Sequence, residues 1–400
     1  MDQPSSGRDE GPRAGLGAAL LRLAAGQLCL HASMTGMRMA TPLLLLSQQH
    51  ARSAVGLVVA MFALAQLLLL LPAGRFADRH GLRRPIVLCV IGSSSGIWLA
   101  ALWPHVAALC VAASLCGTAA GVANLAIQRH VGRMVHTPAE LRQAFSWLSI
   151  APAAANFVGP LLAGIAIDLA GFPAAFALLG TLPVMAWLLL RHTPQSQEQL
   201  PPVAERAPAW ELLRVPVFRR LLLMNWFMTA SWDLHAFLVP VMGHDRGLPA
   251  SAIGAVLGAF AMGAATVRVL MPLFAAHVRE WALITGACAT TAVLLLIYPL
   301  ATIAPAMGAC SFALGLAFGC VQPMVTTLLH HVTPRHRHGE AIALRLMMIN
   351  ASMVAIPPLL GVVSTAVGVS AMFWAMGSLV GLCAPLGARL RGVVVEEGGR

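Results

Sequence analysis

The 400-residue sequence contains no lysine and few charges of any kind: all 26 basic residues are arginine, and 10% of the residues are charged. Hydrophobic residues make up 58% of the chain, and the mean hydropathy is +0.78. A soluble protein of this length could not bury so much apolar surface, and the short alternating segments of a porin are absent. Apolar runs of about 18 residues or more predict an all-α polytopic membrane protein.

The eight cysteines form no C-x-x-C pair. They lie inside apolar segments, so we expect small buried hydrophobic residues and neither disulfides nor a metal site. The histidine-rich run from His330 to His338 surrounds Arg335, which favours an interfacial basic loop over the alternative of a metal site. The missing lysine and the many alanines, glycines and leucines indicate a GC-rich bacterial genome, and therefore a bacterial cytoplasmic (inner) membrane.

Hydrophobic stretches bounded by proline, glycine or arginine predict twelve transmembrane helices in two six-helix bundles, residues 16–191 and 217–390. The polar segment 192–216, rich in proline and glutamine, is predicted to be a cytoplasmic linker between tails at 1–15 and 391–400. The expected spans are 16–46, 53–73, 85–103, 106–128, 141–169, 173–191, 217–243, 250–275, 281–300, 303–329, 339–366 and 370–389.

Arginine placement predicts the orientation of these spans. Arginines gather in the loops that follow the even-numbered spans, whereas the opposite loops hold only Arg52 and Arg246. Because positive charge marks cytoplasmic loops, both termini are predicted to be cytoplasmic. The net charge of +11 is attributed to these loops and not to nucleic-acid binding.

The two halves resemble each other at an offset of about 198 residues. The sequence from Ser53 to Gly56 corresponds to that from Ser251 to Gly254, and Pro160 corresponds to Pro357. Each half begins on the same side of the membrane, so the repeats are parallel. Such repeats predict two bundles that rock about a cavity near the middle of the membrane.

A charged segment between spans two and three, Gly74 to Pro85, reads G-R-F-A-D-R-H-G-L-R-R-P. It resembles the signature loop of the major facilitator superfamily, and the spans, halves and linker extend this resemblance over the whole chain. The resemblance implies a cytoplasmic conformational latch that packs on span eleven and is formed by Gly74, Asp78, Arg79, Gly81, Arg83 and Arg84. Leu82 departs from the family pattern, as does Pro272 in the repeated loop. The alternative is that these arginines only mark topology.

The span-five residues Gly159, Pro160 and Gly164 resemble the Gly-Pro element of the family's antiporters. This resemblance implies a drug or metabolite exporter-like branch, with a plain packing kink as the alternative. Span four lacks the mid-membrane arginine that many drug/proton antiporters of the family carry, which argues against proton-driven drug export.

Ionisable residues inside spans are costly and indicate a cavity or a partner. Span one carries His31 and Arg38, and span seven, its repeat mate, carries Asp233 and His235. The offset places Asp233 about one helical turn from the position opposite Arg38, which predicts an ion pair formed when the outer gate is closed. Two hypotheses follow: Asp233 is the proton-coupling carboxylate, assisted by a histidine, or the pair is a structural gate.

Further candidates have two interpretations each. Arg268 and Arg345 could bind an anionic substrate, but snorkelling to the cytoplasmic interface is favoured. The polar residues could line the cavity or join helices by hydrogen bonds, and the tryptophans could contact an aromatic ligand or only pack. These polar and aromatic residues are Asn124, Gln128, Asn156, Gln322, Asn350, Trp226 and Trp232. Asp168 is expected to be a helix cap or a surface charge.

The sequence therefore predicts a monomeric secondary transporter for a small organic solute and not an enzyme. Proton-coupled export is the favoured mode, with the proton as coupling ion and no cofactor. The alternative is an importer or facilitator for an organic anion that uses Arg38, Arg268 or Arg345 as counter-charge.

Overall fold

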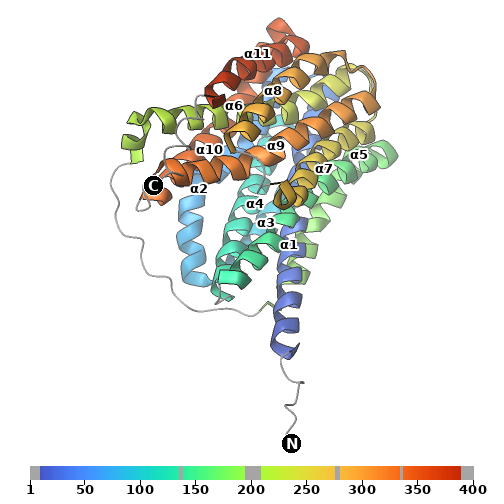
Figure 1. Cartoon of the computed structure of the whole chain (residues 1–400). Helices are drawn as coiled ribbons and strands as arrows, with labels where there is room; N and C mark the ends of the chain where they lie inside the picture. Colours follow the sequence, from blue (N-terminus) through green and yellow to red (C-terminus); the bar gives the residue numbers. More distant parts are fainter. Residues whose placement is uncertain (1–9, 135–137, 194–208, 275–279, 334–336, 389–400) are drawn as a thin grey trace, which may run out of the picture.

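The computed structural model describes residues 10–134, 138–193, 209–274, 280–333 and 337–388, and in this part of the chain every regular element is a helix (Figure 1). The elements are α1 (Glu10–Ser47), α2 (Arg52–His80), α3 (Arg83–Leu102), α4 (Val106–Met134), α5 (Pro138–Leu190), η1 (Ala209–Arg214), α6 (Pro216–Asp245), α7 (Ala250–Phe274), α8 (Glu280–Ile297), η2 (Tyr298–Leu300), α9 (Ala304–Val332), α10 (His338–Val367) and α11 (Val369–Ala388).

Eight of the described helices are long and apolar enough to cross a membrane, namely α2, α3, α4, α5, α7, α8, α9 and α10. The apolar part of α11 is shorter, and α1 and α6 fall outside this set. The window in α5 covers 44 residues, which is about 66 Å of helix and more than two bilayer cores. The all-helical membrane class predicted from the sequence is confirmed.

Glycines with positive φ end or break the helices at three joints. Gly171 (φ 80°) interrupts α5 between the two spans expected there, and Gly368 (φ 85°) separates α10 from α11. Gly81 (φ 68°) ends α2. Other residues reach this region of φ only with strain, so glycine is suited to these sharp turns.

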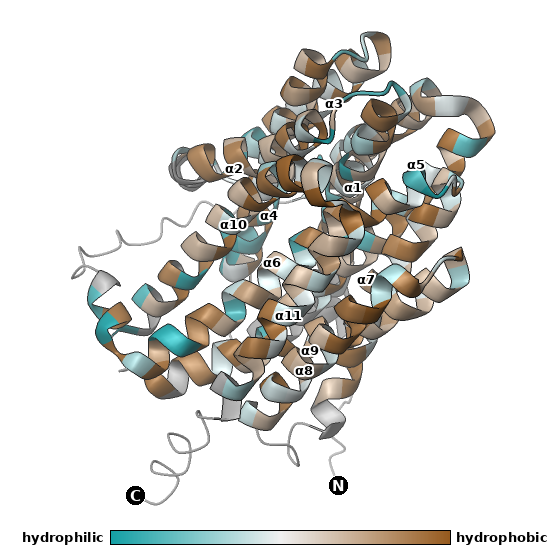
Figure 2. Ribbon diagram, turned by 90° about the horizontal axis from the view of Figure 1, so that it is seen from above, coloured by the Kyte–Doolittle hydropathy of each residue, from teal (hydrophilic) through white to brown (hydrophobic). Residues whose placement is uncertain are grey.

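The charged segment at Gly74 is not a loop, as the resemblance implied, because α2 continues through it to His80. The connection to α3 is reduced to Gly81 and Leu82. The segment has few residues that break helices, and its charges are tolerated where a helix emerges from the apolar layer. Figure 2 shows hydrophobic residues along most of the helices, with hydrophilic residues mainly near helix ends.

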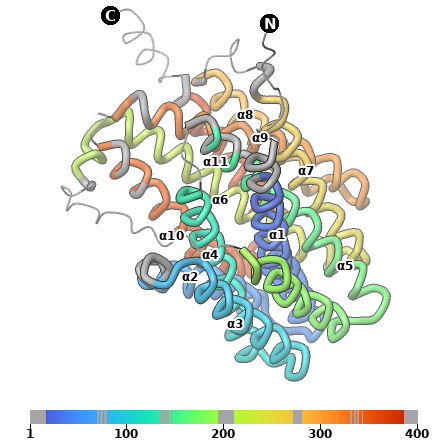
Figure 3. Tube along the Cα trace, turned by 90° about the horizontal axis from the view of Figure 1, so that it is seen from below, coloured from blue at the N-terminus to red at the C-terminus, as the bar shows by residue number. Residues whose placement is uncertain are grey.

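The helices form two packed sets. In the first, α1 packs on α5, and α4 packs on α2 and α3; in the second, α7 packs on α9 and α8 on α11. Figure 1 shows the first set, blue to green, running mainly down the page and α9 and α10 running across it. The sets meet where α5 packs on α7 and α2 on α10, and Figure 3 shows both pairs side by side.

We call the end of the molecule where α1 meets α2 the Arg52 end, and the end where α2 meets α3 the Gly81 end. The sets cross where α2 meets α10 and where α5 meets α7. At both crossings the contact is made by glycines that lie in the half of the helix nearer the Arg52 end. A Cβ on Gly56 of α2 would overlap the carbonyl oxygen of Pro357, and one on Gly361 of α10 would overlap that of Arg52. The crossing of α2 with α10 is therefore backbone against backbone.

The crossing of α5 with α7 repeats this arrangement. A Cβ on Gly254 would overlap the carbonyl oxygen of Pro160, and one on Gly164 would overlap that of Ala250. Gly254 lies 198 residues after Gly56, so the packing follows the repeat found in the sequence. The small residues of span five thus allow this close approach of α5 and α7.

Candidate functional site

A cavity of about 220 Å³ lies between the two sets of helices, large enough for a small organic molecule. Its wall is mainly apolar and rich in methionine, with a few polar side chains. The lining residues are His31, Met34, Thr35, Arg38, Met39, Asn156, Pro160, Trp232, His235, Ala236, Leu257, Phe260, Ala261 and Met353. Flexible methionines adapt to ligands of different shape, and the polar groups can orient them.

The ion pair expected between Arg38 and Asp233 is present. Arg38 Nη2 lies 3.3 Å from Asp233 Oδ1, and the two side chains are 18% and 2% exposed. The pair joins α1 to α6 across the boundary between the two sets. Asp233 Oδ2 and Arg38 Nε are buried without a hydrogen-bond partner among the described residues. The carboxylate thus depends on one contact, which protonation or separation of the helices would break.

His235 connects the cavity to a buried hydrogen-bond chain. Its Nε2 lies 2.9 Å from the hydroxyl of Ser311, which lies 2.8 Å from the hydroxyl of Tyr298. The imidazole ring stacks on Phe260 with a centroid distance of 4.6 Å, and Phe260 meets Trp232 edge-on at 4.5 Å. These contacts fix the aromatic wall of the cavity in one orientation.

Sequence profiles and solved structures identify this architecture. The model of the Major Facilitator Superfamily matches residues 23–231 and again residues 221–399. The chain belongs to the Major Facilitator Superfamily. The expectation of a transporter and not an enzyme is confirmed by the family and by its structural neighbours, and the chain is an integral membrane protein.

Three similar proteins illustrate the relationship. An uncharacterized MFS-type transporter of Bacillus subtilis (strain 168), YdgK, is 29% identical over 136 residues, which is 34% of this chain and about a third (33%) of the relative. A bacterial homolog of the human lysosomal transporter Spinster, inward-facing and unoccupied, has a TM-score of 0.79 at 13% identity, covering 95% of this chain and 98% of that one. A POT family transporter in complex with a thioalcohol conjugated peptide has a TM-score of 0.76 at 12% identity, covering 95% and 96%. The two structures share the fold of this superfamily member.

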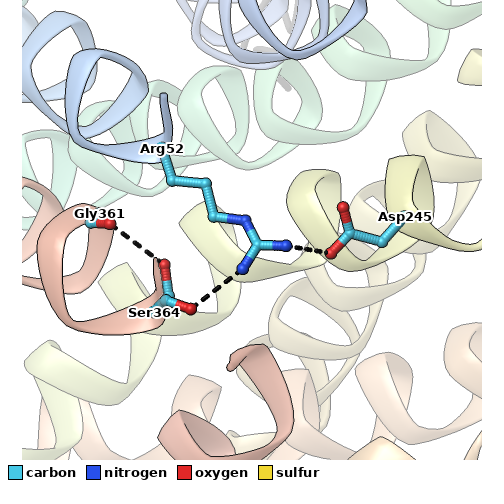
Figure 4. Close-up of polar contacts among 4 residues, drawn as sticks. All are labelled: Arg52, Asp245, Gly361 and Ser364. Atoms are coloured by element: carbon cyan, nitrogen blue, oxygen red, sulfur yellow. Dashed lines mark hydrogen bonds and ion pairs between the residues drawn. The ribbon is translucent and has the colours of Figure 1, made fainter. Parts of the chain in front are cut away.

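Arg52, at the start of α2, forms a second contact between the two sets, which Figure 4 shows in close-up. Its Nη2 lies 2.7 Å from Asp245 Oδ2 on α6, and its Nη1 donates to the carbonyl of Ser364 on α10 at 3.0 Å. One arginine at the start of α2 therefore holds two helices of the other set. The sequence alone gives Arg52 only a role in topology, because its partners lie about 200 and 300 residues away along the chain.

Asp168 caps a helix of the other set, as one of its two sequence interpretations expected. Its Oδ1 accepts the backbone N–H of Ala250 at 2.9 Å, and its Oδ2 accepts that of Ser251 at 2.8 Å. A carboxylate at a helix N-terminus satisfies free N–H groups and meets the positive end of the helix dipole. The first turn of α7 is thus capped by a side chain of α5, across the boundary between the two sets.

We expect Asp168→Ala to weaken the first turn of α7 by about 1 kcal/mol, because losing such a cap costs that amount. Hydrogen exchange of the amides of residues 250 and 251 should accelerate about fivefold, the factor that this energy implies. Asp245→Ala is the matched control, since it removes a carboxylate at the same end and leaves the cap intact. Equal protection in Asp168→Ala and the unmodified protein would contradict the prediction.

The Arg345 guanidinium is held inside the bundle by hydrogen bonds, which differs from the favoured expectation that this side chain extends to the cytoplasmic interface. The residue is 6% exposed and its guanidinium is enclosed by α6 and α9. Its Nε donates to Asn225 Oδ1 at 3.2 Å and its Nη1 to Thr326 Oγ1 at 2.9 Å, while Nη2 donates to Gln322 Oε1. Arg268, by contrast, is exposed on α7, as a snorkelling residue would be.

The remaining candidates separate into cavity and packing roles. Trp232 and Asn156 line the cavity, and Gln322 is a partner of Arg345. Asn124 accepts hydrogen bonds from Gln27 of α1 and from Gln128, at 2.7 and 3.0 Å, so it joins α1 to α4. Like Asn124 and Gln322, the candidates Gln128, Trp226 and Asn350 are not among the residues that line this cavity.

The span-five motif is divided between two neighbours. Gly159 faces α1, where a Cβ would meet Thr35, whereas Gly164 faces the start of α7. Pro160 both lines the cavity and presents its carbonyl to Gly254. The motif therefore places α5 against α1 of its own set and α7 of the other.

The implied latch is only partly visible. The surroundings of Gly74 and the side chains of Asp78 and Arg79 lie outside the described part, so the roles of these residues stay predictions. Arg83 lies over the Trp187 ring of its own set, with its guanidinium carbon 5.7 Å from the ring centroid. Arg84 is exposed.

Several other sequence predictions fall outside the described residues. These are the outer parts of both tails (1–9 and 389–400), most of the linker (194–208) and the loop residues 334–336, together with the side chains of His330, His331 and His338.

Arg337 organises the Gly81 end of the second set. Its Nε lies 2.7 Å from Glu340 Oε2 in the first turn of α10, and its Nη1 lies 3.1 Å from Glu211 Oε2 on η1. The hydrogen bond to Glu340, followed by its charge and by the contacts with Glu211, raises the pKa of Arg337. The contacts fasten the end of the linker region to α10.

Proposed function

We propose that this protein is a secondary active transporter that exports a small organic solute by alternating access in exchange for protons. The observation that carries the proposal is the buried pair of Arg38 and Asp233, which closes the cavity wall between the two sets of helices. A carboxylate that links the two moving parts at the cavity can tie solute release to proton uptake. The coupling ion is the proton, and no cofactor takes part.

The proposal includes the topology. The break of α5 at Gly171 supports twelve spans, with six in residues 16–191 and six in 217–390. The arginine distribution supports cytoplasmic termini, so the Gly81 end faces the cytoplasm. The contacts of Arg52 and Asp168 support a state closed to the outside, in which the implied latch at Asp78 would be released. The proposed location is a bacterial inner membrane, with the monomer as the working unit.

The proposal is tested with purified protein in proteoliposomes under an imposed proton gradient. Dyes and organic acids are screened for flux, and the gradient is then removed with an ionophore. We expect at least one solute to move against its own gradient only while the proton gradient is present. Flux that is unchanged by the ionophore would contradict proton coupling.

A second candidate function is uncoupled passage of an organic anion, and the buried Arg345 favours it. This guanidinium offers positive charge beside the proposed path, and its described partners are all neutral. Flux of organic acids down their own gradient, indifferent to the ionophore, is the outcome that selects this function.

A further inference from the structure

Arg345 is a buried cation whose described partners are all uncharged. Asn225, Thr326 and Gln322 each contribute one neutral oxygen, and no carboxylate in the described part of the chain forms an ion pair with it. Glu340, five residues earlier on α10, is engaged by Arg337 instead. A guanidinium inside a membrane protein is normally paired with a carboxylate or placed where an anion can reach it.

Beside the guanidinium of Arg345, whose nitrogens all have neutral partners, lies one donor without a partner. The Nδ2 amide of Asn225 is buried without a hydrogen-bond partner among the described residues, and Asn225 is 0% exposed. The Oδ1 of the same side chain already binds Arg345, so the amide group is held in place beside the guanidinium. Two kinds of donor, one charged and one neutral, thus lack an anionic acceptor.

Arg345 and its partners lie where a transported solute could pass between the cavity and the Gly81 end. Arg345 precedes the cavity residue Met353 by eight positions on α10, which is about 12 Å along a helix. Asn225 precedes the cavity residue His235 on α6 by a similar distance. Both displacements are towards the Gly81 end, the end proposed to open to the cytoplasm.

The two outer nitrogens of the Arg345 guanidinium have hydrogen-bond partners that a carboxylate can replace. Nη1 donates to Thr326 and Nη2 donates to Gln322, and these residues are one turn apart on α9. Both side chains are only half-buried. A carboxylate brings two oxygens at the spacing of the two N–H groups and makes charge-assisted bonds that neutral oxygens cannot match.

We propose that Arg345, Gln322, Thr326 and Asn225 form a binding site for the carboxylate of an organic anion. The carboxylate displaces the oxygens of Gln322 and Thr326 from the guanidinium, and the amide of Asn225 stabilises it. The site is separate from the pair of Arg38 and Asp233, about two helical turns away along the path. It rests on the proposed function for its role, and it makes the transported solute a carboxylate.

The test measures binding and needs no gradient, so its failure is distinguishable from failure of the proposed transport. Purified full-length protein is titrated with benzoate and with its neutral amide, benzamide, while thermal unfolding is followed. We expect benzoate and not benzamide to stabilise the protein. Arg345→Gln should weaken benzoate binding at least about tenfold, the loss expected for charge-assisted hydrogen bonds. Arg268→Gln, which removes an exposed arginine, should bind benzoate as the unmodified protein does.

A second variant keeps the test informative if Arg345→Gln fails to fold. Gln322→Glu puts a permanent carboxylate where a side-chain oxygen already meets Nη2. We expect this variant to unfold at a higher temperature without ligand and to lose its response to benzoate. Absence of benzoate binding to the unmodified protein, equal binding of benzamide, or undiminished benzoate binding in Arg345→Gln or Gln322→Glu would overturn the proposal.

Discussion

Asp233→Asn is expected to reduce gradient-driven transport to the rate measured without a proton gradient. Asparagine keeps the size of the side chain and still accepts a hydrogen bond from Arg38, but it can neither carry the charge nor bind and release a proton. The substitution leaves the positive charge of Arg38 without its described counter-charge at the cavity wall. The measurement is flux in proteoliposomes at equal solute concentration on both sides, with and without an imposed gradient.

Two variants separate coupling from folding. Asp245→Asn removes a carboxylate that also forms an ion pair between the two sets, yet it lies away from the cavity and is more exposed, so gradient-driven flux should persist. The double variant Arg38→Gln with Asp233→Asn removes both charges; it should recover any thermal stability lost in Asp233→Asn and still lack coupling. Wild-type pH-driven flux in Asp233→Asn would leave the pair as a structural gate only.

Gly361→Ala and Gly56→Ala are expected to disfavour the state closed at the Arg52 end. Each added methyl group would overlap a backbone carbonyl of the other set, that of Arg52 or of Pro357, which no change of rotamer can move aside. Overpacking of this kind costs about 1–3 kcal/mol, or roughly a 5- to 150-fold shift in the ratio of closed to open molecules. Transport should fall steeply, because one of the two required states becomes rare.

The population shift is measured by electron–electron distance spectroscopy with spin labels at exposed positions His50 and Val367. We expect the distance between these ends of α1 and α10 to lengthen in both glycine variants. Gly308→Ala is the matched control, since a Cβ there meets nothing within 4 Å. An unchanged distance distribution in Gly361→Ala would show that the helices absorb the methyl group without parting.

The pair of Arg38 and Asp233 could be predicted because the repeat aligns positions in one half of the chain with equivalent positions in the other. An offset of 198 residues placed two charged positions in equivalent helices, and the rise of a helix then gave their separation. The glycine crossings follow the same repeat, since their members recur in both halves. Where a symmetry relates distant segments, composition and spacing are sufficient to predict contacts.

The surroundings of Arg345 could not be predicted in the same way. Its partners come from α6 and α9, and no repeat relation places Asn225, Gln322 or Thr326 beside it. Snorkelling is a reasonable expectation for an arginine near a helix end, and it failed because three neutral oxygens meet the guanidinium inside the protein. The chain from His235 through Ser311 to Tyr298 was missed for a related reason, since single hydroxyl groups in apolar helices carry no pattern.

Two kinds of contact close the Arg52 end: the glycine crossings and the contacts of charged side chains. The surfaces of Gly56, Gly164, Gly254 and Gly361 meet backbone and carry no group that gains or loses a proton. Their contribution to closure is therefore the same in acid and alkali and at any ionic strength. Sensitivity to ionic strength is left to the ion pairs of Arg38 with Asp233 and of Arg52 with Asp245. A change of side chains at the cavity can thus alter the solute or its coupling while the four glycine contacts stay the same.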